Sequence, residues 1–262
     1  MRGGISAALR LSTAERAPGL ATHSSGNHAQ AVARAAALLG VPAYIVMPRD
    51  APRVKVEAVR GYGAEIVWCV NTPADRQETL DGVVAGTGAA FIHPFDDYGV
   101  IAGQATAAME LIEDVRGPLD LILTPVGGGG LLAGTALAAR FFSLRARVWG
   151  AEPSRVDDAA RSLASGRIET NATNETIADG LRTHLGERNF PIIQRCVERI
   201  LTVDEGEIAA AMRHIWERLK VVCEPSCAVP LAAVLRYPEL FRGRHVGIVL
   251  TGGNVDVDNL PF

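Results

Sequence analysis

Four consecutive glycines stand between an apolar run and an alanine-rich run, and this stretch could bind a phosphate. Residues 119–124 predict a strand and residues 131–142 predict a helix, and the glycines between them are Gly127, Gly128, Gly129 and Gly130. The loop's backbone N–H groups and the positive end of the helix dipole would point at one place. Because glycine has no side chain, an anion can approach the backbone closely there. A tight turn alone needs only one or two glycines, so the pattern favours anion binding.

The same stretch also fits a second kind of phosphate site. Gly128, Gly130 and Ala133 satisfy a relaxed G-x-G-x-x-A pattern, and the next apolar run ends at Glu152, about where a dinucleotide-binding protein carries an acid for the ribose. A nicotinamide- or flavin-dependent oxidoreductase is therefore a competing hypothesis. The glycine pattern alone does not decide between the two.

Two further loops rich in polar residues and glycine adjoin short apolar runs. His23-Ser24-Ser25-Gly26-Asn27-His28 precedes an alanine-rich helix, and Thr251-Gly252-Gly253-Asn254 follows the last apolar run. Apolar and helical runs alternate between them, which predicts parallel sheets with right-handed crossovers. In such an α/β fold, loops at the carboxyl ends of the strands form the ligand-binding crevice.

Local patterns predict several individual elements. Residues 1–16 are expected to form one helix. Asp204 is expected to cap a helix over residues 205–219, because Glu207 stands three residues on, as in a capping box. Lys55 is expected in an exposed helix, and Lys220 near a helix end, where its positive charge is favourable.

The composition excludes several classes of protein. The net charge of −3 gives no reason to expect nucleic acid or an anionic membrane as a partner. No run approaches the ~20 apolar residues of a membrane span, and the first residues lack the apolar segment of a signal peptide. The four cysteines have no ligand cluster around them, which predicts reduced thiols in a cytoplasmic protein rather than a metal site; they are Cys69, Cys196, Cys223 and Cys227.

Six motifs stand in an order that resembles one enzyme family. They are Ser24-Ser25-Gly26-Asn27-His28, the four glycines, Ala151-Glu152-Pro153, Thr176-Ile177-Ala178-Asp179-Gly180, Glu224-Pro225-Ser226 and Thr251-Gly252-Gly253-Asn254. The chain looks like the fold-type-II pyridoxal-phosphate (PLP) enzymes, in the serine/threonine dehydratase and serine racemase branch. This resemblance implies an α/β fold of two open, mainly parallel-sheet domains with PLP between them. The larger domain would comprise residues 1–19 and 98–262, and the smaller, inserted domain residues 20–97.

The resemblance also implies a role for each loop. The four glycines, with Leu131, would hold the cofactor phosphate, Asn27 would bond the ring hydroxyl, and Thr251 would face the pyridine nitrogen. A neutral hydroxyl there suits β-elimination better than transamination. The substrate carboxylate would bind to Ser24, Ser25, Gly26, Asn27 and His28, with Ser25 as an acid/base opposite the lysine. These residues could instead have purely structural roles. Ser24 and Ser25 could only cap a helix, and the histidines could be packed, hydrogen-bonded core residues, a role that we favour for His23 and His93.

A cation site is a further implication of the resemblance. Glu152, the carbonyl of Val156 and Asp158 match a Mg²⁺ or Ca²⁺ site, and these ions prefer oxygen ligands. Such a role would explain Glu152 without a ribose. The competing interpretation is a solvated charge pair at a strand end.

The activity implied by the resemblance is ammonia-lyase chemistry. L-Serine, L-threonine or another 3-hydroxy amino acid would lose its β-hydroxyl and yield a 2-oxo acid and ammonia, with racemisation as a competing outcome, in a cytoplasmic homodimer. No nucleic acid or membrane partner is implied.

The amine that such chemistry needs is not found in its expected context. The family carries its Schiff-base lysine in Ser-Phe-Lys-x-Arg-Gly-Ala, and Arg2-Gly3 aligns with the Arg-Gly of that pattern. The only lysines are Lys55 and Lys220, and neither has this context. We expect the sequence to be truncated just after the lysine, so that the upstream reading frame encodes Ser-Phe-Lys. The alternatives are a catalytically dead PLP- or amino-acid-binding chain and a nicotinamide-dependent oxidoreductase.

Overall fold

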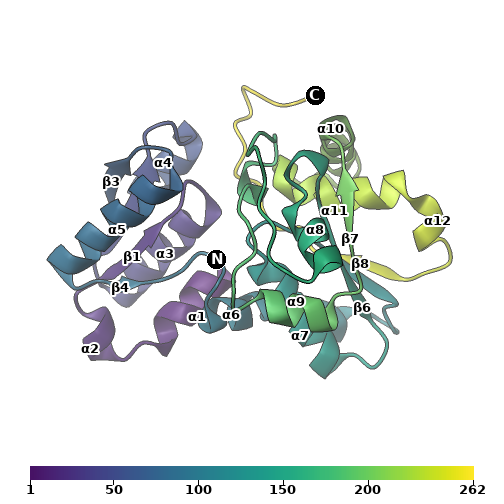
Figure 1. The fold of residues 1–262 in the computed structure, drawn as a ribbon, viewed down its shortest axis with the longest axis horizontal. Coiled ribbons are helices and arrows are strands. Elements are labelled where there is room, and N and C mark those ends of the chain that lie inside the picture. Colours follow the sequence, from purple (N-terminus) through teal and green to yellow (C-terminus); the bar gives the residue numbers. More distant parts are fainter. The chain divides into compact units, whose positions relative to one another are not determined.

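Packing divides the chain into two compact units, residues 1–103 and 104–262. The computed structural model describes residues 1–262 apart from the side chain of Pro73, and its elements are labelled in Figure 1. Helix α6 (Tyr98–Asp114) runs from the first unit into the second. The units are defined by packing alone, and the predicted domain bounds, which assign residues 1–19 to the larger domain, stay a prediction.

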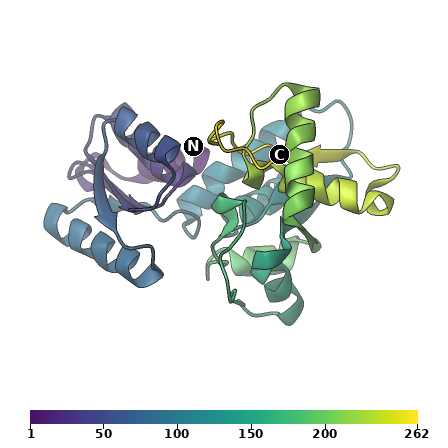
Figure 2. The same cartoon turned by 90° about the horizontal axis from the view of Figure 1, so that it is seen from above.

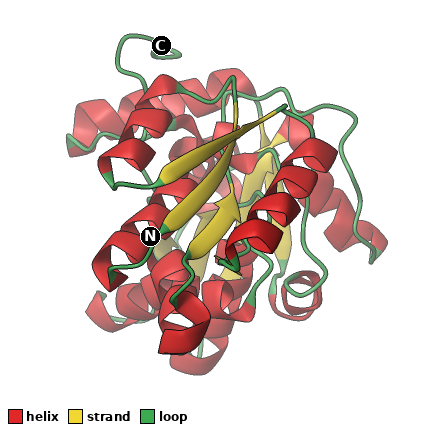
Figure 3. Cartoon of the chain, turned by 90° about the vertical axis from the view of Figure 1, so that its left-hand side faces the viewer, coloured by secondary structure: helices red, strands yellow, loops and turns green.

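The first unit is a parallel four-stranded sheet with the strand order β3-β2-β1-β4. Figure 3 faces this unit and shows its strands side by side among helices. Leu20, Ile45 and Met47 are completely buried, as expected for strands covered on both faces. The strands are β1 (Leu20–His23), β2 (Ala43–Pro48), β3 (Glu65–Cys69) and β4 (Ala90–Phe91), and the helices are α1 (Arg2–Arg10), α2 (Thr13–Arg16), α3 (Asn27–Leu39), α4 (Arg53–Gly61) and α5 (Pro73–Thr87).

The second unit repeats this plan, with the parallel order β7-β6-β5-β8. Every residue of β5 is buried, which matches its continuous apolar run. The strands are β5 (Leu121–Pro125), β6 (Arg147–Pro153), β7 (Arg199–Val203) and β8 (Val246–Ile248), and the helices are α7 (Gly130–Phe142), α8 (Asp158–Ser165), α9 (Phe190–Cys196), α10 (Glu205–His214), α11 (Pro225–Arg236) and α12 (Pro238–Phe241), with short 3₁₀ helices η1 (Ser154–Val156) and η2 (Asp179–Leu181) and a π-helix η3 (Ile215–Leu219). After β8 the chain runs as a coil (Figure 2).

Helix ends test the local predictions. The single helix predicted over residues 1–16 is wrong, because Ser12 and Glu15 form a capping box that starts α2 separately. The predicted capping box at Asp204 is confirmed, with the Asp204 N–H donating to Glu207 at 2.8 Å. The helix that follows becomes a π-helix after His214 and ends at Lys220, which has a left-handed backbone.

The contact between α6 and α1 supplies a stability prediction. A Cβ on Gly103 would lie 2.6 Å from the Ser6 Cβ and 2.7 Å from the Arg2 carbonyl oxygen. Gly103→Ala should therefore lower the free energy of unfolding by about 2 kcal/mol through overpacking. Gly86→Ala, in α5 where nothing lies within 4 Å of the new Cβ, should instead stabilise the protein by up to ~1 kcal/mol. Urea unfolding measures both, and equal effects would contradict the close approach.

Candidate active site

The glycine loop opens α7 at the carboxyl end of β5. Gly129 is the N-cap residue, with φ of 85°, a conformation that side chains other than glycine's rarely adopt. No side chain caps this helix, and the first N–H groups of any α-helix lack partners within it. Leu131 is the second residue of α7. The five residues predicted to hold a phosphate therefore surround the positive end of one helix.

Close neighbours explain why the loop must be glycine. A Cβ on Gly127 would lie 2.9 Å from the Leu181 Cα, and one on Gly129 would lie 2.6 Å from the Asn189 Oδ1. Asn189 is completely buried; its Nδ2 donates to the Gly128 carbonyl at 2.8 Å and its Oδ1 accepts from the Gly186 N–H at 3.2 Å. Sequence reasoning missed Asn189, because nothing in its own surroundings signals a partner 61 residues away.

The serine-rich loop lies at the start of α3 in the first unit. β1 ends at His23 and α3 begins at Asn27. The Ser24 hydroxyl accepts from the Gly26 N–H at 3.2 Å, and Gly26 is the N-cap residue, with no side-chain cap and no acid in the first turn. Ser24 thus stabilises the turn itself, and the start of α3 keeps its positive character.

Two histidines near this loop, His28 and His23, have pKa values well below the usual value for histidine. His28 lies within 3.1 Å of the Ile92 carbonyl, and burial lowers its pKa to about 4. Burial also lowers the pKa of His23 to about 4, and its ring stacks on Phe91. The His93 Nδ1 accepts from the N–H groups of Phe95 and Asp96. His28 can therefore offer a hydrogen bond at neutral pH but no positive charge.

Lys55 is not exposed, contrary to our expectation. Its exposed fraction is 2%, and its Cδ and Nζ lie 3.6 Å from the position that a Cβ on Gly26 would take. The helical pattern of α4 did not show this, because the covering loop lies almost thirty residues earlier. A cation therefore lies beside the start of α3.

The two carboxylates predicted to bind a cation are both buried, at 1% exposure. Glu152 accepts from the N–H groups of Ala160 at 2.7 Å and Ala159 at 3.3 Å, and the Asp158 Oδ1 accepts from the Asn171 amide at 2.5 Å. Burial raises the pKa of both groups, most strongly that of Glu152. The alternative of a solvated charge pair is therefore wrong.

One carboxylate oxygen of this pair is buried without a hydrogen-bond partner in the described part of the chain, and a cation could bind to it. The Asp158 Oδ2 is buried and has no hydrogen-bond partner among the described residues. Val156, which stands between Glu152 and Asp158 in the sequence, lies in η1 and is also buried. The described residues contain no group of three or more His, Cys, Asp or Glu side chains that could hold a metal, so a cation would need carbonyl or water oxygens as further ligands.

The third loop, residues 251–254, is hydrogen-bonded to the start of α11 and to the segment just before it. The Thr251 N–H donates to the Cys227 sulfur at 3.2 Å, and the Glu224 N–H donates to the Gly252 carbonyl at 3.0 Å. A Cβ on Gly253 would lie 2.4 Å from the Val222 carbonyl oxygen. Thr251 itself is exposed.

Residues 1–252 match the family described as "Pyridoxal-phosphate dependent enzyme". The chain belongs to this family. It is 46% identical to the beta-hydroxyaspartate dehydratase of Paracoccus denitrificans (100% of this chain, 83% of the relative) and 48% identical to the L-threo-3-hydroxyaspartate ammonia-lyase of Saccharomyces cerevisiae (98% and 78%). The structure of maize serine racemase superposes with a TM-score of 0.95 at 42% identity, covering 98% of this chain and 79% of the other. The predicted fold class and family are confirmed.

Membership decides between the two phosphate hypotheses. The family uses PLP, so the nicotinamide-dependent alternative is not supported, and the match of the glycines to the dinucleotide pattern is coincidental. The residues present fit a PLP phosphate, because close neighbours keep side chains out of the loop at Gly127 and Gly129, and the loop opens a helix whose first N–H groups have no side-chain cap.

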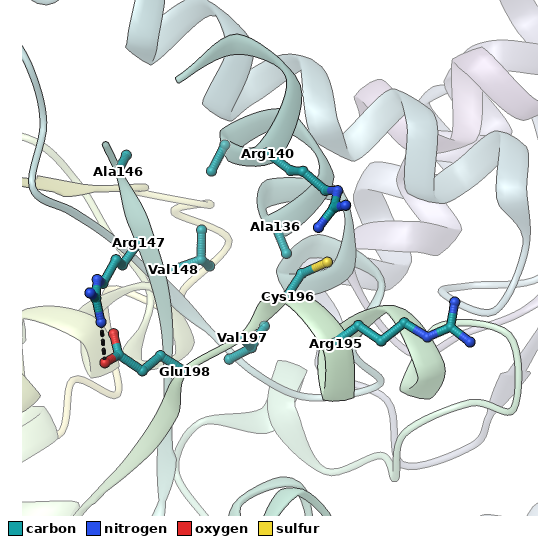
Figure 4. Close-up of a pocket in the computed structure, with 10 residues that line it drawn as sticks. Ala136, Arg140, Ala146, Arg147, Val148, Arg195, Cys196, Val197 and Glu198 are labelled. Atoms are coloured by element: carbon teal, nitrogen blue, oxygen red, sulfur yellow. Dashed lines mark hydrogen bonds and ion pairs between the residues drawn. The ribbon is translucent and has the colours of Figure 1, made fainter. Parts of the chain in front are cut away.

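A cavity of about 340 Å³ lies beside the amino ends of strands β6 and β7 in the second unit. It is lined by residues that include Arg140, Arg147, Cys196 and Glu198, and Figure 4 shows Arg147 facing Glu198 in an ion pair of 2.7 Å. Arg147 begins β6 and Glu198 directly precedes β7, while Arg140 and Cys196 lie near the ends of α7 and α9. The glycine loop instead follows the carboxyl end of β5. The cavity is therefore not part of the predicted PLP site.

Proposed function

We propose that this chain catalyses PLP-dependent removal of ammonia from L-serine, L-threonine or a 3-hydroxy amino acid such as 3-hydroxyaspartate, with racemisation as a competing outcome. The observation that carries the proposal is the glycine loop at the start of α7, whose Gly128 carbonyl accepts a hydrogen bond from the buried Asn189 side chain. The hydroxyaspartate enzymes among the similar proteins support elimination, and the similar racemase supports the competing outcome.

The chain's own residues would bind and orient the substrate. The carboxylate accepts from the N–H groups at the start of α3 and from Ser24, Ser25 and Asn27. Ser25 holds or supplies the proton on one face of the α-carbon. His28, which is neutral, adds a hydrogen bond without a charge. Bound PLP supplies the electron sink for the carbanion at the α-carbon.

Other residues would hold the cofactor. Gly127 to Gly130 and Leu131 bind the phosphate, Asn27 bonds the ring hydroxyl, and the neutral hydroxyl of Thr251 faces the ring nitrogen. A hydroxyl cannot provide the negative charge that would hold a proton on that nitrogen, which favours elimination over transamination.

The test measures PLP binding and turnover separately. PLP should bind to the protein in equilibrium dialysis. A variant that carries Ser-Phe-Lys ahead of Met1, so that the amine needed for this chemistry is present, should when loaded with PLP release ammonia and a 2-oxo acid from at least one of L-serine, L-threonine and L-threo-3-hydroxyaspartate. PLP binding without release would favour the alternative of a catalytically dead PLP-binding chain. If the protein bound NADH and did not bind PLP, the proposed function would be wrong.

A divalent cation, Mg²⁺ or Ca²⁺, is the second part of the proposal. Glu152, the Val156 carbonyl and Asp158 would be its protein ligands, supported by the buried, unpartnered Asp158 Oδ2. Its role would be to neutralise two carboxylates that burial otherwise disfavours as charged groups.

This site predicts a pH-dependent stabilisation by Mg²⁺. The folded-state pKa of both acids is raised, so their protonated forms stabilise the native state at low pH and that stability is lost as the pH rises through the raised pKa values. A cation must displace those protons, so Mg²⁺ should raise the Tm more at pH 8 than at pH 5. At tenfold excess over its Kd the gain is about 1.4 kcal/mol.

The control for the Mg²⁺ effect is a pair of variants. Asp158→Asn should abolish the stabilisation, whereas Asp256→Asn, in the exposed C-terminal segment, should keep it. An equal Mg²⁺ effect at both pH values, or in Asp158→Asn, would refute the site.

We also propose a cytoplasmic homodimer. The four cysteines are unpaired, which supports a reducing compartment, and no helix in the described part of the chain could cross a membrane. The dimer rests on the family resemblance, and light scattering would test it.

A further inference from the structure

Two buried cysteines lie near the Thr251 turn, residues 251–254, and one of them accepts a hydrogen bond from it. Cys223 and Cys227 are each 1% exposed, and they flank Glu224 and Pro225, where α11 begins. Both are free thiols, and each shifts the pKa of the other. The chain therefore holds two buried, neighbouring thiols at the start of α11 inside the second unit.

The Cys227 sulfur is also the acceptor that fixes Thr251. It receives the Thr251 N–H at 3.2 Å, and the Thr251 hydroxyl and the Gly252 N–H contribute further hydrogen bonds. The same turn is tied by the Glu224 N–H to the Gly252 carbonyl. The position of the Thr251 hydroxyl thus depends on what stands at residue 227.

We propose that Cys223 and Cys227 form an oxidisable thiol pair, and that closing their disulfide releases the Thr251 turn and weakens PLP binding. The second half of this inference rests on the proposed contact of Thr251 with the cofactor ring. Cys227 is then a positioning residue in the reduced protein, and the pair is a site of oxidative modification.

The electronic surroundings assign a role to each thiol. Hydrogen bonds from Cys223 and from the Thr251 turn lower the pKa of Cys227 to about 6, whereas the same contact raises the pKa of Cys223. Cys227 also lies in the first turn of α11, whose positive end favours a thiolate, and its sulfur accepts the Thr251 N–H at 3.2 Å. Cys227 is therefore the nucleophile and Cys223 the resolving thiol.

A peroxide is the oxidant that this pair requires. The Cys227 thiolate attacks one peroxide oxygen, the O–O bond breaks, and with one proton the second oxygen leaves as water, giving a sulfenic acid. The Cys223 sulfur then attacks the Cys227 sulfur, and the hydroxyl leaves as a second water with the Cys223 proton. The two thiols lose two electrons and peroxide gains them.

The disulfide changes what the turn can bond to. A disulfide sulfur carries no negative charge and no S–H donor, so it is a much weaker acceptor for the Thr251 N–H and hydroxyl. The sulfur must also move toward Cys223 to reach bonding distance. We expect PLP to bind about tenfold more weakly to the oxidised protein.

The first experiment treats the PLP-free protein with hydrogen peroxide and maps the thiols by alkylation and mass spectrometry. Wild type and Cys196→Ser should both form the 223–227 disulfide, because Cys196 lies elsewhere, at the end of α9. Cys223→Ser and Cys227→Ser should not form it. Equilibrium dialysis should then show about tenfold weaker PLP binding for oxidised wild type than for reduced wild type, and no such change when Cys227→Ser, which lacks the attacking thiol, is compared before and after peroxide treatment.

A second readout needs no cofactor. Hydrogen exchange of the amides at 251–253 should accelerate in oxidised wild type and in Cys227→Ala, and less in Cys227→Ser, whose oxygen can still accept a hydrogen bond. Failure of the reduced protein to bind PLP would count against the proposed function, and this exchange measurement would still decide the thiol pair. Absence of the disulfide, or unchanged exchange in oxidised protein, would overturn the inference.

Discussion

Gly129→Ala is expected to weaken PLP binding on the order of 100-fold, which corresponds to about 2.7 kcal/mol. The backbone at Gly129 has φ of 85°, where a side chain costs roughly 1–2 kcal/mol. The new Cβ would also lie 2.6 Å from the Asn189 Oδ1 and 2.7 Å from a Leu185 methyl carbon, and overpacking of this kind costs about 1–3 kcal/mol. The loop can relieve the backbone strain and the close contacts of the new Cβ only by turning its N–H groups away from the phosphate.

Gly117→Ala is the matched control for Gly129→Ala. Gly117 also has a positive φ, of 107°, but nothing lies within 4 Å of its Cβ position, and it precedes β5 rather than following it. It should lose about 1 kcal/mol of stability from backbone strain alone and bind PLP like wild type. Equilibrium dialysis and urea unfolding separate the two effects. Unchanged PLP affinity in Gly129→Ala would mean that the loop does not hold the phosphate.

Short-range patterns carried the successful predictions of the fold. The alternation of apolar and helical runs predicted the parallel sheets, because a strand covered on both faces needs a continuous apolar run such as 121–125. The capping box at Asp204 was visible for the same reason, since both partners lie within one turn. The equivalent pattern at Ser12 and Glu15 also lies within one turn, but it stands inside the longer apolar periodicity that predicts one helix over residues 1–16.

Long-range contacts account for what the sequence did not reveal. Lys55 looked exposed because its burial depends on the loop at Gly26, and the burial of Glu152 depends on the N–H groups of α8. Asn189 carries no motif at all, yet it fixes the carbonyl of Gly128. The motifs therefore located the loops that face a ligand, whereas the residues that hold those loops in place came only from the structure.

Asn189→Asp is expected to cost about 3 kcal/mol of stability at pH 8 and to recover much of it in acid. The new carboxylate would still accept from the Gly186 N–H, but its second oxygen would face the Gly128 carbonyl, where the amide now donates at 2.8 Å. Two acceptors in a completely buried place repel each other and lack a proton, so the folded-state pKa of the new carboxyl is raised. The stability deficit should be small below pH ~4, where the acid is protonated in both states, and should grow as the pH rises through the raised pKa.

The control for this substitution is Asn259→Asp, on the exposed C-terminal segment, which should match wild type at every pH. Urea unfolding of the three proteins from pH 4 to pH 8 gives the difference from wild type at each pH, so that titration of all other groups cancels. PLP binding by Asn189→Asp should follow the same curve, since the protonated side chain can again donate to Gly128 and restore the loop. A deficit independent of pH would mean that Asn189 only fills space, and that the Gly128 carbonyl does not need its donor.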